Sequence, residues 1–203
     1  MISDLHLAAL AAAAYEGVPT IQVGDAFIYL TPVDGLLVAA FRGTKPEHLP
    51  DVLSDLNAVP IDNDKLGTCH AGFLANVLGI ADQAMAATAG ARVVVTGHSK
   101  GAAEAALFAG LLVASGRPPV QLSTFGMPRP AFGTLRNLLA AVPGADYRHG
   151  CDPVTEVPIG FLHPRQIVQL GPVEVKLDPI SDHMIAAYSA ALAAVDDSGE
   201  NAA

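Results

Sequence analysis

Ser99 lies at the centre of the segment GHSKG at positions 97–101, which fits the Gly-x-Ser-x-Gly pattern of a nucleophilic serine. The segment follows a β-branched run at 92–96 and precedes an Ala-rich stretch of helical character over about 100–114. A sharp turn between a buried strand and a helix lifts the serine hydroxyl clear of the sheet. The helix N-terminus then favours negative charge that develops beside it. We therefore predict that Ser99 is a nucleophile.

A serine hydroxyl is a poor nucleophile unless a neighbouring base takes its proton. His183 follows the last pair of predicted strands and precedes the final predicted helix at 185–195, where the base belongs when the chain order is serine, acid, histidine. We predict that His183 is the base. The other histidines are read as helix, core or loop residues, and they are His6, His48, His70, His98, His149 and His163.

The base needs a carboxylate that fixes its tautomer and stabilises the imidazolium. Asp152 comes directly after a strand candidate at 145–149 and precedes Pro153, which places it at the boundary between a strand and a loop. Asp178 and Asp182 are alternatives, although Asp182 is adjacent to His183 and neighbouring side chains rarely align for such a contact. A capping or turn aspartate is the structural alternative for Asp152.

An oxyanion that forms at the attacked carbonyl needs hydrogen-bond donors from two places. The backbone N–H of Lys100, immediately after the nucleophile, is one candidate. The segment FRGT at 41–44 supplies the other, because a buried strand and a glycine bend precede Thr44, which offers an N–H and an Oγ–H. The alternative is a plain strand end followed by a turn.

Strands that alternate with helices must position these residues, and this order indicates an α/β fold with a mostly parallel sheet covered by helices on both faces. We expect a single domain over 1–195 and a flexible tail over 196–203. The predicted helices are 3–15, 73–87, about 100–114, 135–141 and 185–195, and the predicted strands are 26–31, 36–42, 92–96, 120–125 and 145–149, with a hairpin of 165–170 and 173–177.

The composition narrows the choice of partner. The net charge of −9 argues against nucleic acid and against electrostatic capture by an anionic membrane, so a small-molecule or lipid ester is the expected substrate. No apolar stretch reaches the length of roughly 18 residues that a membrane span needs. Neither a metal nor an organic cofactor is implied. Cys69 and Cys151 are too few for a disulfide framework and are expected to be free thiols.

The first residues resemble the apolar core of a signal peptide over 7–14, but no Lys or Arg precedes them and Asp4 stands where positive charge is typical. We read this segment as a helix with Ser3 as its N-cap and Gly17 just beyond its end. The expectation from this reading is a cytoplasmic protein.

Taken together, the motifs resemble the class 3 lipases, the fungal-lipase type of α/β-hydrolase. The family's motifs occur in its order across about 38–188, and they are Phe41-Arg42-Gly43-Thr44, Leu53-Ser54-Asp55-Leu56, His70-Ala71-Gly72-Phe73, the serine segment, Phe125-Gly126-Met127-Pro128-Arg129, Asp152-Pro153-Val154, and Asp182-His183 with Tyr188 beyond. The resemblance implies an α/β-hydrolase fold, a Ser99–Asp152–His183 triad, and an oxyanion hole of Thr44 and Lys100.

The resemblance also implies hydrolysis of a carboxylic ester through an acyl-enzyme, by a lipase or an esterase. A helical lid over about 45–59 and transient contact with a lipid interface would belong to it, whereas a fixed surface helix is the alternative. The chain is short for the family and has no Trp, so Val52 and Leu53 stand where related lids carry bulk. A phospholipase, feruloyl esterase or thioesterase, or a non-catalytic binding protein of this fold, are the alternative functions.

Overall fold

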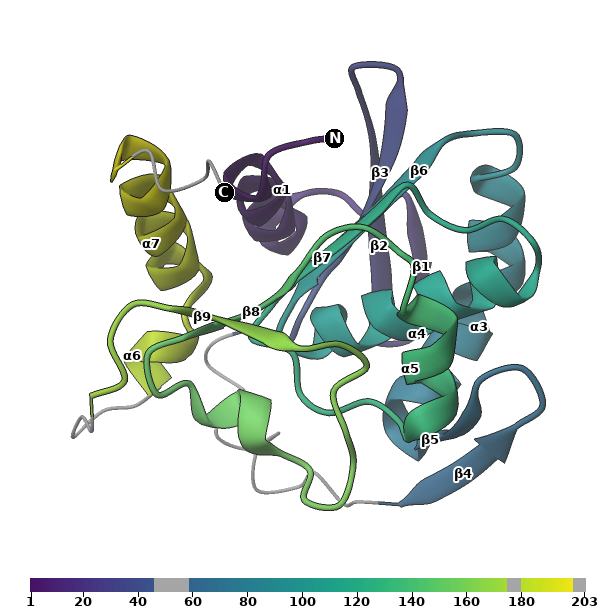
Figure 1. Cartoon of the computed structure of the whole chain (residues 1–203). Helices are drawn as coiled ribbons and strands as arrows, with labels where there is room; N and C mark the ends of the chain where they lie inside the picture. Colours follow the sequence, from purple (N-terminus) through teal and green to yellow (C-terminus); the bar gives the residue numbers. More distant parts are fainter. Residues whose placement is uncertain (46–58, 175–179, 199–203) are drawn as a thin grey trace.

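The computed structural model describes residues 1–45, 59–174 and 180–198. A seven-stranded sheet runs through the molecule in the order β1-β2-β3-β6-β7-β8-β9 (Figure 1). The first three strands are antiparallel, and the five from β3 to β9 are parallel. The strand bounds are β1 Ile21–Val23, β2 Ala26–Val33, β3 Leu36–Phe41, β6 Val93–His98, β7 Gln121–Phe125, β8 Asp146–His149 and β9 Ile167–Leu170. A separate pair consists of β4 Pro60–Asn63 and β5 Gly67–His70.

Helices cover both faces of the large sheet. On one face lie α1 (Asp4–Glu16) and α7 (Ile185–Ser198), and on the other lie α3 (Ala71–Ala87), α4 (Lys100–Ala114) and α5 (Gly133–Leu139) (Figure 1). Short helices at Pro153–Glu156 (η2) and Ile180–His183 (α6) follow β8 and precede α7. This arrangement confirms the predicted α/β fold with a mostly parallel sheet.

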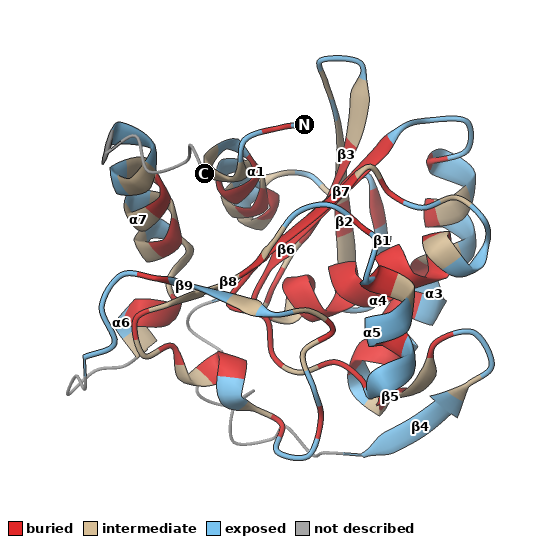
Figure 2. Cartoon of the chain, in the orientation of Figure 1, coloured by how far each residue is buried: buried red, intermediate tan, exposed pale blue. Residues whose placement is uncertain are grey.

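Alternation along the central strands builds the two apolar layers. Val38 and Val94 pack with α1 and α7, whereas Ala39 and Val95 pack with α3 and α4. Figure 2 shows β6, β7 and α4 as the most continuously buried part of the chain, and all six residues of β6 are buried. The β-branched run at 92–96 predicted a strand buried on both faces, and β6 is such a strand.

Strand register brings the candidate functional segments to one edge of the sheet. Phe41 at the end of β3 lies opposite Gly97, and His98 at the end of β6 lies opposite Phe125. The residues after these strands therefore emerge side by side, as the residues after β8 do. In open α/β sheets the carboxyl ends of parallel strands form the usual ligand site.

Some local elements differ from the prediction. Of the expected hairpin of 165–170 and 173–177, the first part forms β9, which pairs parallel with β8 after a long crossover, and residues 171–174 are not a strand, whereas 175–177 lie outside the described residues. The β4–β5 pair and β1 were not predicted, and α7 continues to Ser198. The lid expected over about 45–59 falls almost wholly outside the described residues.

Cys69 is buried, Cys151 is partly exposed, and both are free thiols. Among the helices of the described ranges, none is long and apolar enough to cross a membrane.

Candidate active site

Ser99 occupies a strained turn between β6 and α4. Its backbone has φ 58° and ψ −134°, a left-handed conformation that side chains rarely adopt outside functional sites. The turn is tight enough that a Cβ at Gly97 would lie 2.5 Å from the carbonyl oxygen of Gly101. The Ser99 N–H donates to the Phe125 carbonyl oxygen at 3.0 Å, which fixes the turn to β7. The geometry matches the predicted elbow.

His183 and Asp152 form a buried pair next to this turn. The Nδ1 atom of His183 lies 2.8 Å from Oδ2 of Asp152. Asp152 also accepts from the Tyr188 hydroxyl at 2.5 Å and from the Val154 N–H at 2.8 Å. Burial by itself would raise the pKa of Asp152, but the hydrogen bond and charge of His183, helped by Tyr188, outweigh it and lower the pKa below its usual value.

The pair lies against the residues that hold Ser99. A Cβ at Gly126, which directly follows the carbonyl that accepts from Ser99, would meet Asp152 Oδ2 at 2.8 Å and His183 Nδ1 at 3.0 Å. The far nitrogen of His183, Nε2, is buried and has no hydrogen-bond partner in the described part of the chain. Since Nδ1 faces Asp152 and donates its proton there, Nε2 is the nitrogen left to accept one.

His98 lies between the first helix and His183, a role that the sequence did not predict. Its Nε2 contacts the His183 carbonyl oxygen at 2.7 Å, and its Nδ1 contacts the Tyr15 hydroxyl at 2.7 Å. A carbonyl only accepts, so His98 Nε2 carries the proton and Nδ1 accepts from Tyr15. Burial, followed by the nearby His183, lowers the pKa of His98 to about 3, so this ring stays neutral. The sequence signal was its place beside Ser99.

The alternative acids and bases have other partners. Asp182 lies against His149, at 3.5 Å, and accepts from the Cys151 N–H at 2.9 Å, so it does not serve His183. Nε2 of His163 contacts the Thr155 carbonyl oxygen. His70 caps the N-terminus of α3. Asp178 and His48 lie outside the described residues.

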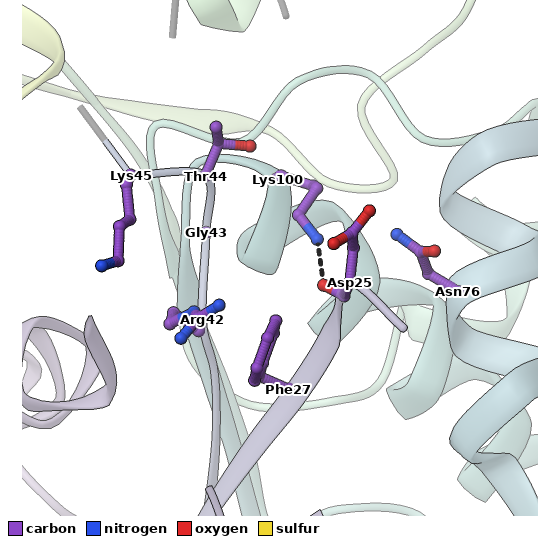
Figure 3. A pocket seen from close by; sticks show the side chains of 8 residues that line it. All are labelled: Asp25, Phe27, Arg42, Gly43, Thr44, Lys45, Asn76 and Lys100. Carbon is purple, nitrogen blue, oxygen red and sulfur yellow. Dashed lines mark hydrogen bonds between the residues drawn. The ribbon is translucent and has the colours of Figure 1, made fainter. Parts of the chain in front are cut away.

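The predicted oxyanion residues come from the ends of β3 and β6, whereas Asp152 follows β8, on the other side of β6 in the sheet. A Cβ at Gly43 would lie 3.0 Å from Ser99 Cβ and 2.5 Å from the His98 carbonyl oxygen, so the segment that ends at Thr44 passes directly beside the serine. Thr44 and Lys100 line a common cavity of about 530 Å³ (Figure 3). The Lys100 ammonium does not point at the serine but pairs with Glu104 at 3.1 Å.

No group of three or more His, Cys, Asp or Glu side chains that could hold a metal ion occurs within the described ranges.

The five candidate residues predicted from the sequence come from four segments that meet at one edge of the sheet. These segments are the ends of β3, β6 and β8, and the end of α6.

Comparison with known proteins gives a consistent picture of the fold. The family model described as lipase (class 3) matches residues 38–161. The chain is 35% identical over 119 residues to secreted mono- and diacylglycerol lipase 1 of Fusarium solani, a match that covers 52% of this chain. It spans only 35% of the length of that relative.

Two solved structures share the architecture. A variant of the Penicillium cyclopium protein MDLA has 21% sequence identity and a TM-score of 0.66, with 89% of this chain and 82% of that one covered. The Rhizomucor miehei triacylglyceride lipase has 20% identity and a TM-score of 0.69, with 82% and 78% covered.

These findings correct one expectation from the sequence. The cytoplasmic location was inferred from the lack of basic residues before an apolar run, but the curated relative is a secreted protein, which contradicts that expectation. The charges of the few residues before the apolar run, among them Asp4, were too weak a signal from which to infer a location. The family model, in contrast, covers more than half of the chain and includes the predicted elbow, oxyanion segment and acid. This chain belongs to the class 3 lipase family.

Proposed function

We propose that this chain hydrolyses carboxylic esters through an acyl-enzyme on Ser99. In this mechanism His183 Nε2 takes the proton from the Ser99 hydroxyl as the oxygen attacks the ester carbonyl. His183 then gives that proton to the leaving alcohol, and a water molecule repeats the sequence to release the acid. Asp152 holds the His183 ring and stabilises its charged form.

The tetrahedral intermediate carries negative charge on the former carbonyl oxygen. The Lys100 N–H at the first position of α4 and the N–H and hydroxyl of Thr44 are the donors that we assign to it. The strained backbone of Ser99 supports this assignment, since it places the residue at the N-terminus of α4, where the helix dipole favours an anion. The proposal assigns the activity to one domain over 1–195.

One observation carries the proposal. The His183 ring is held by Asp152 through Nδ1 at 2.8 Å, while its buried Nε2 has no partner among the described residues and belongs to a ring packed beside the Ser99 turn. A histidine with a purely structural role would be expected to use both nitrogens, as His98 does. The name of the Fusarium relative makes mono- and diacylglycerols the first natural esters to test.

Replacing the nucleophile tests the proposal. Ser99→Ala should lower the kcat for a short-chain p-nitrophenyl ester by about 10⁴-fold or more, because the covalent route is lost. Its unfolding midpoint in urea should stay at or above that of the wild type, since the strained turn loses only an oxygen. The control is Ser189→Ala, which removes a partly buried hydroxyl on α7. It should retain full activity.

Labelling with a fluorophosphonate gives an independent measurement. The probe should attach to the wild type and to the Ser189→Ala protein, and a tryptic digest should place it on Ser99. Turnover by Ser99→Ala at near the wild-type rate, or labelling at another serine, would sink the assignment.

A further inference from the structure

The cavity beside the Ser99 turn is rich in positive charge. It has a volume of about 530 Å³, within the range of small-molecule sites, and Arg42, Lys45 and Lys100 line it together with Thr44 (Figure 3). The chain has 11 Lys and Arg against 20 Asp and Glu, so three of its few cations gather at this one cavity. Such a concentration in an acidic chain needs a physical reason.

Arg42 is the cation with unused donors. Its guanidinium carbon lies 3.3 Å from the centroid of the Phe27 ring, which fixes the plane of the group. Among the described residues, no acceptor bonds to its side chain, and its Nε is buried without a partner. A guanidinium offers five N–H donors in a rigid fork that fits two oxygen atoms of one anion.

The other charges at the cavity do not cancel this one. Lys100 donates to Glu104 at 3.1 Å and to the Asp25 carbonyl oxygen at 2.6 Å, so its charge is matched by a buried carboxylate. The Asn76 amide also donates to Glu104, at 2.7 Å. Lys45 and the carboxylate of Asp25 are both exposed and opposite in sign. Among the described residues, the charge left unmatched at the cavity is that of Arg42.

We propose that this cavity binds an anionic oxygen group, a carboxylate or a phosphate, carried by the ester that reacts at Ser99. The inference rests on the proposed function and names the substrate class of the same site. Gly43 and Thr44 connect the two, since Gly43 lies beside the serine and both residues line the cavity. In this proposal the Arg42 fork holds the anionic group of the ester and Lys45 adds charge at the rim.

Esters matched in length but not in charge test this. The neutral substrate is p-nitrophenyl pentanoate. Its carboxylate partner is the mono-p-nitrophenyl ester of glutaric acid, in which the terminal methyl becomes a carboxylate. The p-nitrophenyl ester of phosphonobutyric acid carries a phosphonate at a similar position and stands for phosphate. The quantity measured is the ratio of kcat/KM for each anionic ester to kcat/KM for the neutral ester, within one protein.

Arg42→Gln should lower that ratio about 10-fold for whichever anionic ester the wild type prefers, because a charge-assisted hydrogen bond is lost. Lys45→Gln should lower it less, about 2- to 3-fold, since an exposed cation is screened by solvent. The matched control is Lys65→Gln, which makes the same change in net charge at the exposed β4–β5 turn. It should leave the ratio unchanged.

The ratio cancels any general loss of activity in a variant, and Lys45→Gln remains informative should Arg42→Gln fail to fold. Suppose that the wild type hydrolyses p-nitrophenyl pentanoate. If Arg42→Gln leaves the ratios for both anionic esters unchanged, or if Lys45→Gln does so where Arg42→Gln does not fold, the anionic site is wrong and the proposed esterase activity stands. A wild type that hydrolyses none of the three esters overturns the proposed function itself.

Discussion

Two imidazole rings lie 4.6 Å apart in the candidate site, and their partners give them different chemistry. His98 has both nitrogens satisfied, by Tyr15 and by the His183 carbonyl oxygen, so it holds the backbone of its neighbour. His183 has one nitrogen satisfied and the other buried without a partner among the described residues. At the residue scale, the hydrogen-bond partners distinguish a positioning histidine from a proposed base, although the two rings are close neighbours.

The neutral state of His98 makes stability depend on pH. Its pKa is about 3 in the folded protein and about 6.5 in the unfolded chain, so between these values only the unfolded chain takes up this proton. The stabilisation is complete above about pH 6.5 and is lost as the pH falls toward 3. From about pH 6.5 to 5 the wild type should therefore lose about 2 kcal/mol of unfolding free energy from this residue alone.

His98→Gln isolates the effect, because glutamine keeps a donor for the His183 carbonyl and never titrates. Urea unfolding of both proteins at several pH values gives the two slopes. Burial lowers the pKa of His163 as well and raises the pKa of Glu104, and these act in opposite directions, but both groups are present in both proteins and cancel in the difference. Identical slopes in the two proteins would show that His98 is not held neutral.

At the scale of elements, the first turn of α4 is pressed against the end of β3. A Cβ at Gly101 would overlap the carbonyl oxygen of Phe41 and lie 2.7 Å from the carbonyl carbon of Arg42. Neither neighbour is a flexible side-chain end. The contact sets how close the Lys100 N–H comes to the segment that carries Thr44. The packing of α4 against the end of β3 therefore determines the geometry of the proposed oxyanion hole.

Gly101→Ala should therefore destabilise the protein by about 1–3 kcal/mol, as overpacking of backbone against backbone does, and should lower the kcat for a short ester. The matched control is Gly79→Ala in the exposed middle of α3, where the new Cβ would lie 3.8 Å from Val23. That change should stabilise by about 0.5–1 kcal/mol, since alanine is the better helix former. Urea unfolding and ester turnover measure both variants. Equal effects of the two substitutions would contradict the close packing of α4 on β3.

The sequence predicted those elements whose signals are local. The β-branched run before Ser99, the glycines around it and the N-cap at Ser3 all act within a few residues, and the structure has each of them in place. The pairing of β9 with β8 instead joins segments separated by a crossover of many residues, and no local pattern predicted it. The contact of His98 with Tyr15 joins residues 83 positions apart, and no local pattern encodes it.

At the scale of the whole molecule, charge is segregated. The surface is acidic overall, with a net charge of −9 and an isoelectric point near 5.0, while the Arg42 cavity is a small positive inclusion beside the proposed nucleophile. Other cationic side chains form ion pairs, such as Arg165 with Asp146 and Arg148 with Glu156. Salt screens the long-range field of the acidic surface far more than it screens short-range contacts inside the Arg42 cavity. The two features should therefore respond differently to ionic strength.

This separation predicts how the protein meets lipid surfaces. Near pH 7, sedimentation with phosphatidylcholine vesicles should retain more protein than sedimentation with vesicles that also contain phosphatidylserine, since the molecule and the anionic surface repel each other. Added salt should shrink the difference, and a pH below about 5 should reverse it as the net charge changes sign. Tighter retention on phosphatidylserine vesicles near pH 7, weakened by salt, would instead mean that the cations around Arg42 recruit a membrane rather than a single small anion.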